Sequence, residues 1–369
     1  MNYYLIFIVD FFLLLFVSYY IRHRYLRDAY AATSAGAIVM ALSVFVWALL
    51  PQLPGKTFLF APYLTLEIII VWLFIAESYV KCYLGRHFYI HMRDLLNRFN
   101  MGTWSCSTAL LAILCRKVFA DWEEIAWILG LIATALWIEY LHISIHDLRI
   151  LARKQMTFKL NGSLLLPAIT TQTIVIMIYT LARNWFPASM SITLLLFGYA
   201  SYLGGLILLI RSFWQTRTKQ TLGEWSHENA YIHAGLSITG IACVFSEIIP
   251  ASIIMTTWVA AAILFVLVES FAFIGLLQAT FKNGLKSIVS YDVSQWTRVF
   301  AYAGFYAFAL NVLHMPNHFS HLQIILQMIV KYGQYIVTLL LLVQLGIFFH
   351  AKYKPAVIKR FPQLQKHER

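Results

Sequence analysis

The chain alternates long apolar blocks with short polar connections. Each block is about 20 residues long, which is the length that an α-helix needs to cross the hydrocarbon core of a bilayer. Long, almost uncharged blocks of this kind predict membrane-spanning helices. We expect eleven spans, at residues 4–21, 31–50, 59–80, 101–118, 125–145, 163–181, 190–209, 230–249, 253–277, 299–313 and 332–349.

Basic side chains are concentrated in alternate connections. The odd-numbered connections and the C-terminal tail hold 23 of the 28 lysines and arginines, whereas the even-numbered connections hold four. Cytoplasmic loops of membrane proteins are enriched in these residues, so the asymmetry predicts an N-terminus outside and a cytoplasmic C-terminus. A missed or invented span early in the chain would abolish the asymmetry, which supports the count of eleven.

Composition leaves no room for a folded soluble domain. The chain is 60% hydrophobic and 12% charged, about half the charge of a soluble domain. Its net charge of +12 would suit nucleic acid, but the alternation of the basic residues explains that charge by topology, and we expect no nucleic-acid partner. We predict an all-α integral membrane protein with an extra helix and basic loop at 1–30, a transmembrane domain at 31–350 and a basic tail at 351–369.

Every second predicted helix is rich in small residues. In twelve-residue windows at 31–42, 102–113, 162–173, 233–244 and 300–311, Gly, Ala, Ser and Thr fill 32 of 60 positions, against 18 of 60 in windows from the helices that follow. Small residues let helices approach closely, and hydroxyl groups satisfy polar demands within lipid. The alternation predicts an inner and an outer ring built from five helical hairpins. Ordinary close packing without a pore is the alternative.

Acidic residues are absent from the five small-residue windows. A carboxylate in a narrow pore attracts cations and repels anions, so a wall of hydroxyl groups favours an anion or a neutral solute. Acids within membranes form salt bridges or carry protons, and Glu139 or Glu269 would take the coupling proton of a carrier. The acids of the apolar blocks lie mostly on outer helices or at helix ends: Asp10, Glu67, Glu77, Glu139, Glu247 and Glu269.

Four short segments carry a family resemblance. Residues 101–109 read Met-Gly-Thr-Trp-Ser-Cys-Ser-Thr-Ala, residues 161–173 read Asn-Gly-Ser-Leu-Leu-Leu-Pro-Ala-Ile-Thr-Thr-Gln-Thr, residues 232–240 read Ile-His-Ala-Gly-Leu-Ser-Ile-Thr-Gly, and residues 296–300 read Trp-Thr-Arg-Val-Phe. These segments resemble the tellurite-resistance/dicarboxylate transporter family, which includes the slow anion channels of plant guard cells. The likeness covers roughly residues 101–349.

The resemblance implies ten helices in five hairpins around a central pore that a phenylalanine occludes, often in a trimer. The gating phenylalanine of the family would fall on Phe300. Ala301 stands where the family usually has proline, and an alignment one turn later would select Phe305 instead. The N-terminal helix is a further departure from the family pattern.

Histidine pairs favour a rival hypothesis. His87 and His91, and likewise His142 and His146, are four residues apart, which places both imidazoles of a pair on one helix face. Membrane desaturases and hydroxylases resemble this pattern, but they use adjacent histidine pairs, which the chain lacks. The four cysteines have no paired spacing, so neither a disulfide framework nor a zinc site is predicted. We therefore expect no metal or cofactor and no enzyme activity, with a His-metal membrane enzyme as the alternative.

The leading hypothesis is passive or ion-coupled transport of small anions, such as C4-dicarboxylates or other oxyanions, across the plasma membrane. Hydroxyl groups supply hydrogen-bond donors to an anion without a fixed charge. Phe300 or Phe305 would form the gate of the pore. The expected partners are the anionic solute, membrane lipid and further copies of the chain in a homotrimer. The candidate pore-lining residues are Ser105, Thr108, Thr170, Thr171, His233, Ser237 and Thr239.

Overall fold

The structure, a computed structural model, describes residues 2–25, 30–119, 121–153, 160–216, 225–284, 290–315 and 320–360. These ranges are helical almost throughout and contain no β-strand. The predicted all-α class is therefore confirmed. Helices long and apolar enough to cross a membrane occupy Thr33–Gln52, Thr57–Leu84, Glu123–Arg153, Gly162–Ala182, Ala188–Gln215, Ala251–Lys282 and Leu322–Ala351.

The remaining four predicted spans also form helices. They are α1 (Asn2–Tyr25), α6 (Gly102–Val118), α10 (Tyr231–Ser246) and α13 (Gln295–Leu313). The helices α6 and α10 have only 17 and 16 residues, near the lower limit for crossing a bilayer core. The count of eleven spans, the orientation of the termini and the plasma membrane remain predictions.

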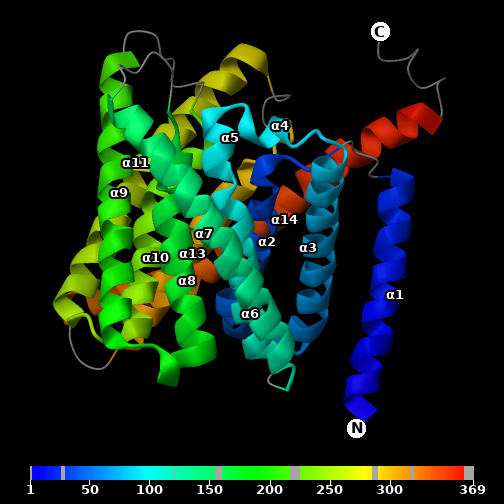
Figure 1. Cartoon of the computed structure of the whole chain (residues 1–369), viewed down its shortest axis with the longest axis horizontal. Helices are drawn as coiled ribbons and strands as arrows, with labels where there is room; N and C mark the ends of the chain where they lie inside the picture. The colour runs from blue at the N-terminus through cyan, green and yellow to red at the C-terminus, as the bar shows by residue number, and fades with distance from the viewer. Residues whose placement is uncertain are drawn as a thin grey trace.

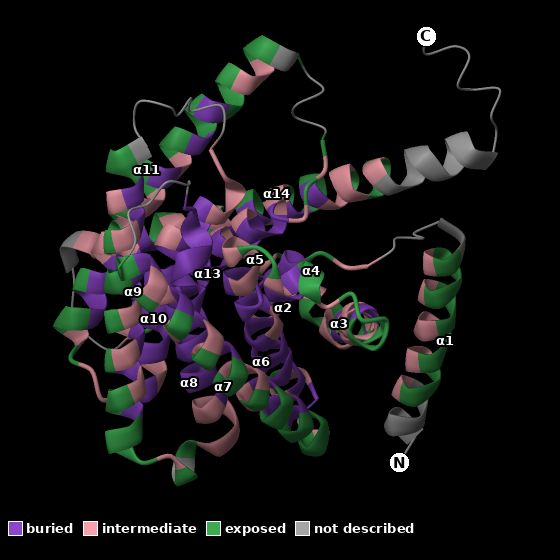
Figure 2. Ribbon diagram, turned by 45° about the horizontal axis from the view of Figure 1, so that its top comes forward, coloured by how far each residue is buried: buried purple, intermediate pink, exposed green. Residues whose placement is uncertain are grey.

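Five helices contact one another in a closed cycle. The contacts run from α2 (Gly36–Val44) to α6, then to α8 (Leu166–Ala182), α10 and α13, and back to α2. Figure 2 shows that buried residues concentrate in these helices. In the segments that contain α2 and α8, 78% of the apolar window is buried, against 22% to 28% in the other five candidate spans. We call these five helices the ring.

The helix that follows each ring helix packs against its outer side. These outer helices are α3 (Ala61–Leu84), α7 (Glu123–Arg153), α9 (Ala188–Thr216), α11 (Ala251–Asn283) and α14 (Ser320–Arg360). Figure 1 shows both sets as a bundle of upright and inclined helices. The outer helices carry most of the exposed apolar side chains, as expected of surfaces that face lipid.

Small residues allow the ring to close. A methyl group at Gly36 would lie 2.4 Å from the carbonyl oxygen of Thr103, so α2 meets α6 backbone to backbone. A methyl group at Gly162 would lie 2.0 Å from the carbonyl oxygen of Glu228, so the turn before α8 meets the turn before α10. Any side chain at either position would separate the two segments.

The first helix stands beside the ring rather than in it. Figure 1 shows α1 apart from the bundle and next to α3. Ser18 donates a hydrogen bond to Glu67, and Arg22 pairs with Glu77, which also binds Lys81. Two of the predicted membrane acids therefore attach α1 to the outer helix α3.

Candidate functional site

One side of α13 faces the outer helices. Arg298 and Tyr302 bind Glu269 of α11. One turn further along the same side, the ring of Phe305 stacks on Phe265 of α11 at 4.8 Å. Phe305 also lies 6.2 Å from Trp258 of that helix. The structure thus places Phe305 between a ring helix and an outer helix.

Phe300 lies on the opposite side of α13. It is two positions from Arg298, and successive residues of an α-helix are rotated by about 100°, so its side chain points away from α11. It is wholly buried, and its ring lies 6.4 Å from that of Tyr231 on the neighbouring ring helix α10. Phe300 therefore points into the ring.

Three of the predicted hydroxyl groups bind to outer helices. Ser105 donates to the carbonyl oxygen of Ala133 on α7. Thr108 accepts a hydrogen bond from the indole of Trp72 on α3, and Thr171 accepts one from the indole of Trp137 on α7. These side chains hold the two layers together.

Thr170 has a different environment from its neighbour Thr171. Thr171 faces α7, and Gln172 reaches the carbonyl oxygen of Leu195 on α9. By the helical rotation, Thr170 and Thr173 lie on the side of α8 that faces away from both outer helices. Thr173 is 3.3 Å from the thiol of Cys106 on α6, which places this pair between two ring helices.

The other two predicted hydroxyl groups lie on the flanks of α10. Thr239 is one turn after Gly235, which meets Tyr202 of α9. Ser237 is one turn after His233, which faces α11. Both hydroxyl groups are wholly buried and donate to the carbonyl oxygens four residues earlier in α10.

Hydrogen bonds join neighbouring ring helices at the end where these helices begin. Thr103 of α6 donates to the carbonyl oxygen of Thr33, just before α2. Ser163 before α8 donates to Asn100 before α6, at 2.7 Å. The backbone N–H of Gly162 donates to Asn229 before α10, and Thr297 of α13 donates to Tyr231 of α10. All five ring helices therefore begin at the same end of the bundle, which we call the N-terminal mouth.

A cluster of ionisable side chains joins α10, α11 and α13. Glu269 binds Arg298 and accepts a hydrogen bond from Tyr302 at 3.0 Å. His233 Nε2 lies 3.5 Å from the second oxygen of Glu269, at the limit of a hydrogen bond. Neither ring nitrogen of His233 has a closer polar partner among the described residues. His233 is wholly buried, and its imidazole packs edge-on against Phe265 at 4.9 Å.

A cavity of about 360 Å³ leads to this cluster. Glu269 and Arg298 line this cavity together with His227, Asp292 and Gln295, which lie just before α10 or around the start of α13 at the N-terminal mouth. Burial lowers the pKa of His227, and the nearby positive charge of Arg298 lowers it further. The cavity therefore connects Glu269 to polar side chains that lie outside the predicted spans.

The structure adds residues that the sequence did not indicate. Thr173, Cys106 and Tyr231 lie between ring helices, and Arg298 pairs with Glu269. Thr173 belongs to the polar run that begins at Thr170. That run was the feature of the sequence that could have indicated Thr173. A pairing between residues 29 positions apart on different helices has no signature in a single sequence.

The histidine pairs do not form a cluster with other ligands. His91 is buried against Thr33, and His146 lies 3.4 Å from Asp147. Within the part of the chain that the structure describes, no three His, Cys, Asp or Glu side chains gather closely enough to hold a metal ion. No family model and no curated protein matches the chain.

Proposed function

We propose that the protein transports small anions along the axis of the ring. The observation that carries this proposal is the closed cycle of contacts among α2, α6, α8, α10 and α13. Five helices around a common axis can separate slightly to open a path, whereas the outer helices keep their contacts with lipid. The motif resemblance to the tellurite-resistance/dicarboxylate transporters favours the same arrangement, as well as a trimer and the plasma membrane.

The charges of the ring support an anion over a cation. None of the five ring helices contains Asp or Glu within its bounds. All five begin at the N-terminal mouth, where the positive ends of their helix dipoles favour negative charge. An anion inside the ring would meet the hydroxyl groups of Thr170 and Thr173, which now donate to carbonyl oxygens of their own helix. A rotation of these hydroxyl groups would redirect their protons to the anion.

Phe300 is our choice for the gate. It points into the ring, whereas Phe305 is held in a stack on α11. An aromatic ring in a narrow path removes the hydration of an ion and offers no replacement ligand.

The experiment compares anion currents of the wild type, Phe300→Ala and Phe305→Ala in planar bilayers. We expect Phe300→Ala to raise the conductance about tenfold or more, which corresponds to a barrier lower by about 1.4 kcal/mol. Phe305→Ala is the matched control, because it removes the same atoms from the side that faces α11. Reversal potentials in a salt gradient should indicate anions. The proposal would be contradicted if the three proteins gave equal currents, if their currents were cation-selective, or if none of them gave a current.

Coupling to protons is a second candidate, which the cluster around Glu269 favours. Glu269 is buried beside His233 and reached by a cavity, whereas Glu139, the other candidate acid, is exposed on α7. An ionisable pair inside a membrane protein is a recurrent proton site. Uptake of a dicarboxylate into liposomes should then rise with an inward proton gradient, and Glu269→Gln should remove the rise. If uptake by the wild type did not depend on the proton gradient, proton coupling would be excluded and a channel would remain as the proposal.

A further inference from the structure

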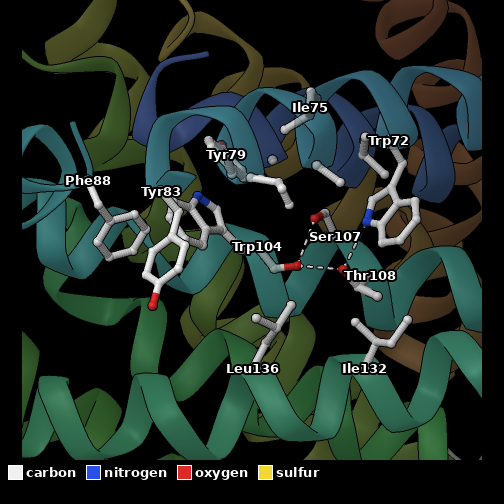
Figure 3. Close-up of a pocket in the computed structure, with 14 residues that line it drawn as sticks. Trp72, Ile75, Tyr79, Tyr83, Phe88, Trp104, Ser107, Thr108, Ile132 and Leu136 are labelled. Atoms are coloured by element: carbon white, nitrogen blue, oxygen red, sulfur yellow. Dashed lines mark hydrogen bonds between the residues drawn. The ribbon is translucent and has the colours of Figure 1, made fainter. Parts of the chain in front are cut away.

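A second cavity, also of about 360 Å³, opens between the outer helices α3 and α7. Its floor is formed by α2 and α6, so it reaches the outer surface of the ring. Figure 3 shows its lining as a row of aromatic and aliphatic side chains with a few hydroxyl groups on one side. We call this cavity the α3–α7 groove.

The groove is elongated along α3. Residues of α3 that line it recur at helical spacing from Trp72 through Ile75 and Tyr79 to Tyr83. From Trp72 to Tyr83 the stripe rises by eleven residue steps, or about 16 Å along the α-helix. Because α3 is one of the candidate membrane spans, the long axis of the groove runs across the bilayer, in the direction of lipid acyl chains.

Polar groups of α3 and α6 that line the groove already have partners. The indole of Trp72 donates to Thr108, and that of Trp104 donates to the carbonyl oxygen of Thr33. Ser107 donates to the carbonyl oxygen of Trp104, and the hydroxyl of Tyr79 donates to the carbonyl oxygen of Ala32. An occupant would therefore meet apolar surface without hydrogen-bond demands, as a hydrocarbon chain requires.

The rim of the groove opens to the surroundings. Val80, Tyr83 and Ile132 are 55%, 67% and 38% exposed, and all three line the groove. A chain could thus enter sideways from the bilayer between α3 and α7.

The short segment that joins two residues at one end of the groove carries a basic side chain. Tyr83 and Phe88 line that end, and exposed Arg86 lies between them in the sequence. Lys81, one turn of α3 away, is held by Glu77, so Arg86 is the free positive charge of this segment among the described residues. An arginine at this level suits the phosphate of a headgroup, and an excess of positive charge favours lipids with a net negative charge.

We infer that the α3–α7 groove binds one acyl chain of an anionic phospholipid, whose phosphate lies beside Arg86. The chain fills the apolar stripe and packs against the junction of α2 and α6. The bound lipid covers the surface of the ring between α3 and α7.

Photolabelling tests this site. The full-length protein is reconstituted in phosphatidylcholine vesicles that contain a small fraction of phosphatidylglycerol with a diazirine on its acyl chain, and the labelled peptides are identified by mass spectrometry. We expect saturable labelling within residues 72–83 and 104–108, displaced by unlabelled phosphatidylglycerol more readily than by phosphatidylcholine. Labelling spread evenly over the lipid-facing helices would overturn the assignment.

Three variants test the acyl-chain site and the headgroup site separately. Ile132→Trp fills the groove and should lower its labelling several-fold, whereas Ile128→Trp, one turn earlier and exposed on the same helix, should not. Arg86→Gln should remove the preference for phosphatidylglycerol while chain labelling persists. Unchanged labelling in Ile132→Trp would reject the acyl-chain site, and an unchanged preference in Arg86→Gln would reject the headgroup assignment. Displacement in the unmodified protein tests the site even where a variant folds poorly.

Discussion

The ring of Phe308 on α13 lies directly over Gly240, so it packs against the bare backbone of α10. A methyl group at Gly240 would lie 1.9 Å from the ring of Phe308. Two atoms that are not bonded to each other do not approach this closely, so an added methyl group would force the helices apart. Both residues belong to the ring.

Gly240→Ala should therefore destabilise the protein. Overpacking a well-packed interior costs about 1–3 kcal/mol, here because α10 and α13 must move apart. The measurement is the thermal unfolding midpoint in detergent. Gly204→Ala is the control, since nothing lies near the added methyl group on α9 and alanine is the better helix former. A loss of stability in Gly204→Ala as large as that in Gly240→Ala would contradict the argument.

The ion pair between Arg298 and Glu269 should matter more than the exposed pair between Arg183 and Glu247. Glu269 is 10% exposed and Arg298 25% exposed, against 65% and 59% for Glu247 and Arg183. Removal of one partner of a buried pair leaves an uncompensated charge and costs about 3–5 kcal/mol, whereas exposed pairs contribute about 0–1 kcal/mol. The cavity beside Glu269 admits water, so we expect the lower part of the first range for Glu269→Gln.

Unfolding of Glu269→Gln, Arg298→Gln and the double variant would measure this coupling. We expect the double variant to lose less stability than the two single variants lose in sum, because the double variant leaves neither charge without its partner. Glu247→Gln serves as the exposed comparison. Simple additivity in the Glu269 and Arg298 cycle would show that the pair contributes nothing.

His91 should make stability depend on pH. It is wholly buried, its Nδ1 lies 2.8 Å from the hydroxyl of Thr33, and burial lowers its pKa below the ordinary value of 6.5. The unfolded chain takes up a proton near pH 6.5 that the folded protein does not, so folding is weakened as the pH falls below that value. Above it, the contribution of His91 to stability is fully present.

Unfolding midpoints measured across this pH range would detect the effect. We expect His91→Gln to flatten the decline below pH 6.5, since glutamine takes up no proton. His142→Gln removes an exposed histidine from α7 and should leave the decline unchanged. His227, whose pKa is also lowered by burial, should account for a part of the decline that remains. A decline as steep in His91→Gln as in the wild type would contradict a contribution from His91.

Particular residues show how far the sequence predicted this structure. The windows rich in small residues fall on α2, α6, α8, α10 and α13, and these helices are the buried ones. Composition was sufficient to predict which helices are buried, because small side chains allow helices to pack closely. The sequence left salt bridges and proton transfer as alternatives for the membrane acids. In the structure Glu77, Glu247 and Glu269 form ion pairs, and Glu67 accepts a hydrogen bond from Ser18.

Composition could not predict the orientation of each ring helix about its own axis, that is, which of its side chains face inward. Thr170 and Thr171 are the same residue type at adjacent positions, yet only Thr171 receives the indole hydrogen bond of Trp137. The choice depends on the side chains of another helix, more than 30 positions away in the sequence. The hydrophobic pattern does not supply it, because α8 is buried on every side from Leu166 to Met177 and carries polar residues on several of those sides.

This difference between Thr170 and Thr171 yields a prediction that separates transport from stability. Thr171→Val leaves the indole N–H of the half-buried Trp137 without its partner, which costs about 1–3 kcal/mol, but the side that faces into the ring is unchanged. Thr170→Val removes a hydroxyl group from that inner side and leaves no donor of another residue unpaired. Thr170→Val should therefore lower anion flux in liposomes while stability changes little, and Thr171→Val should do the reverse. The decisive comparison is flux per folded protein, with the folded fraction taken from gel filtration and the unfolding midpoint. Equal flux in both variants would mean that Thr170 does not line the path, and a loss of flux confined to Thr171→Val would place the path between α7 and α8 instead.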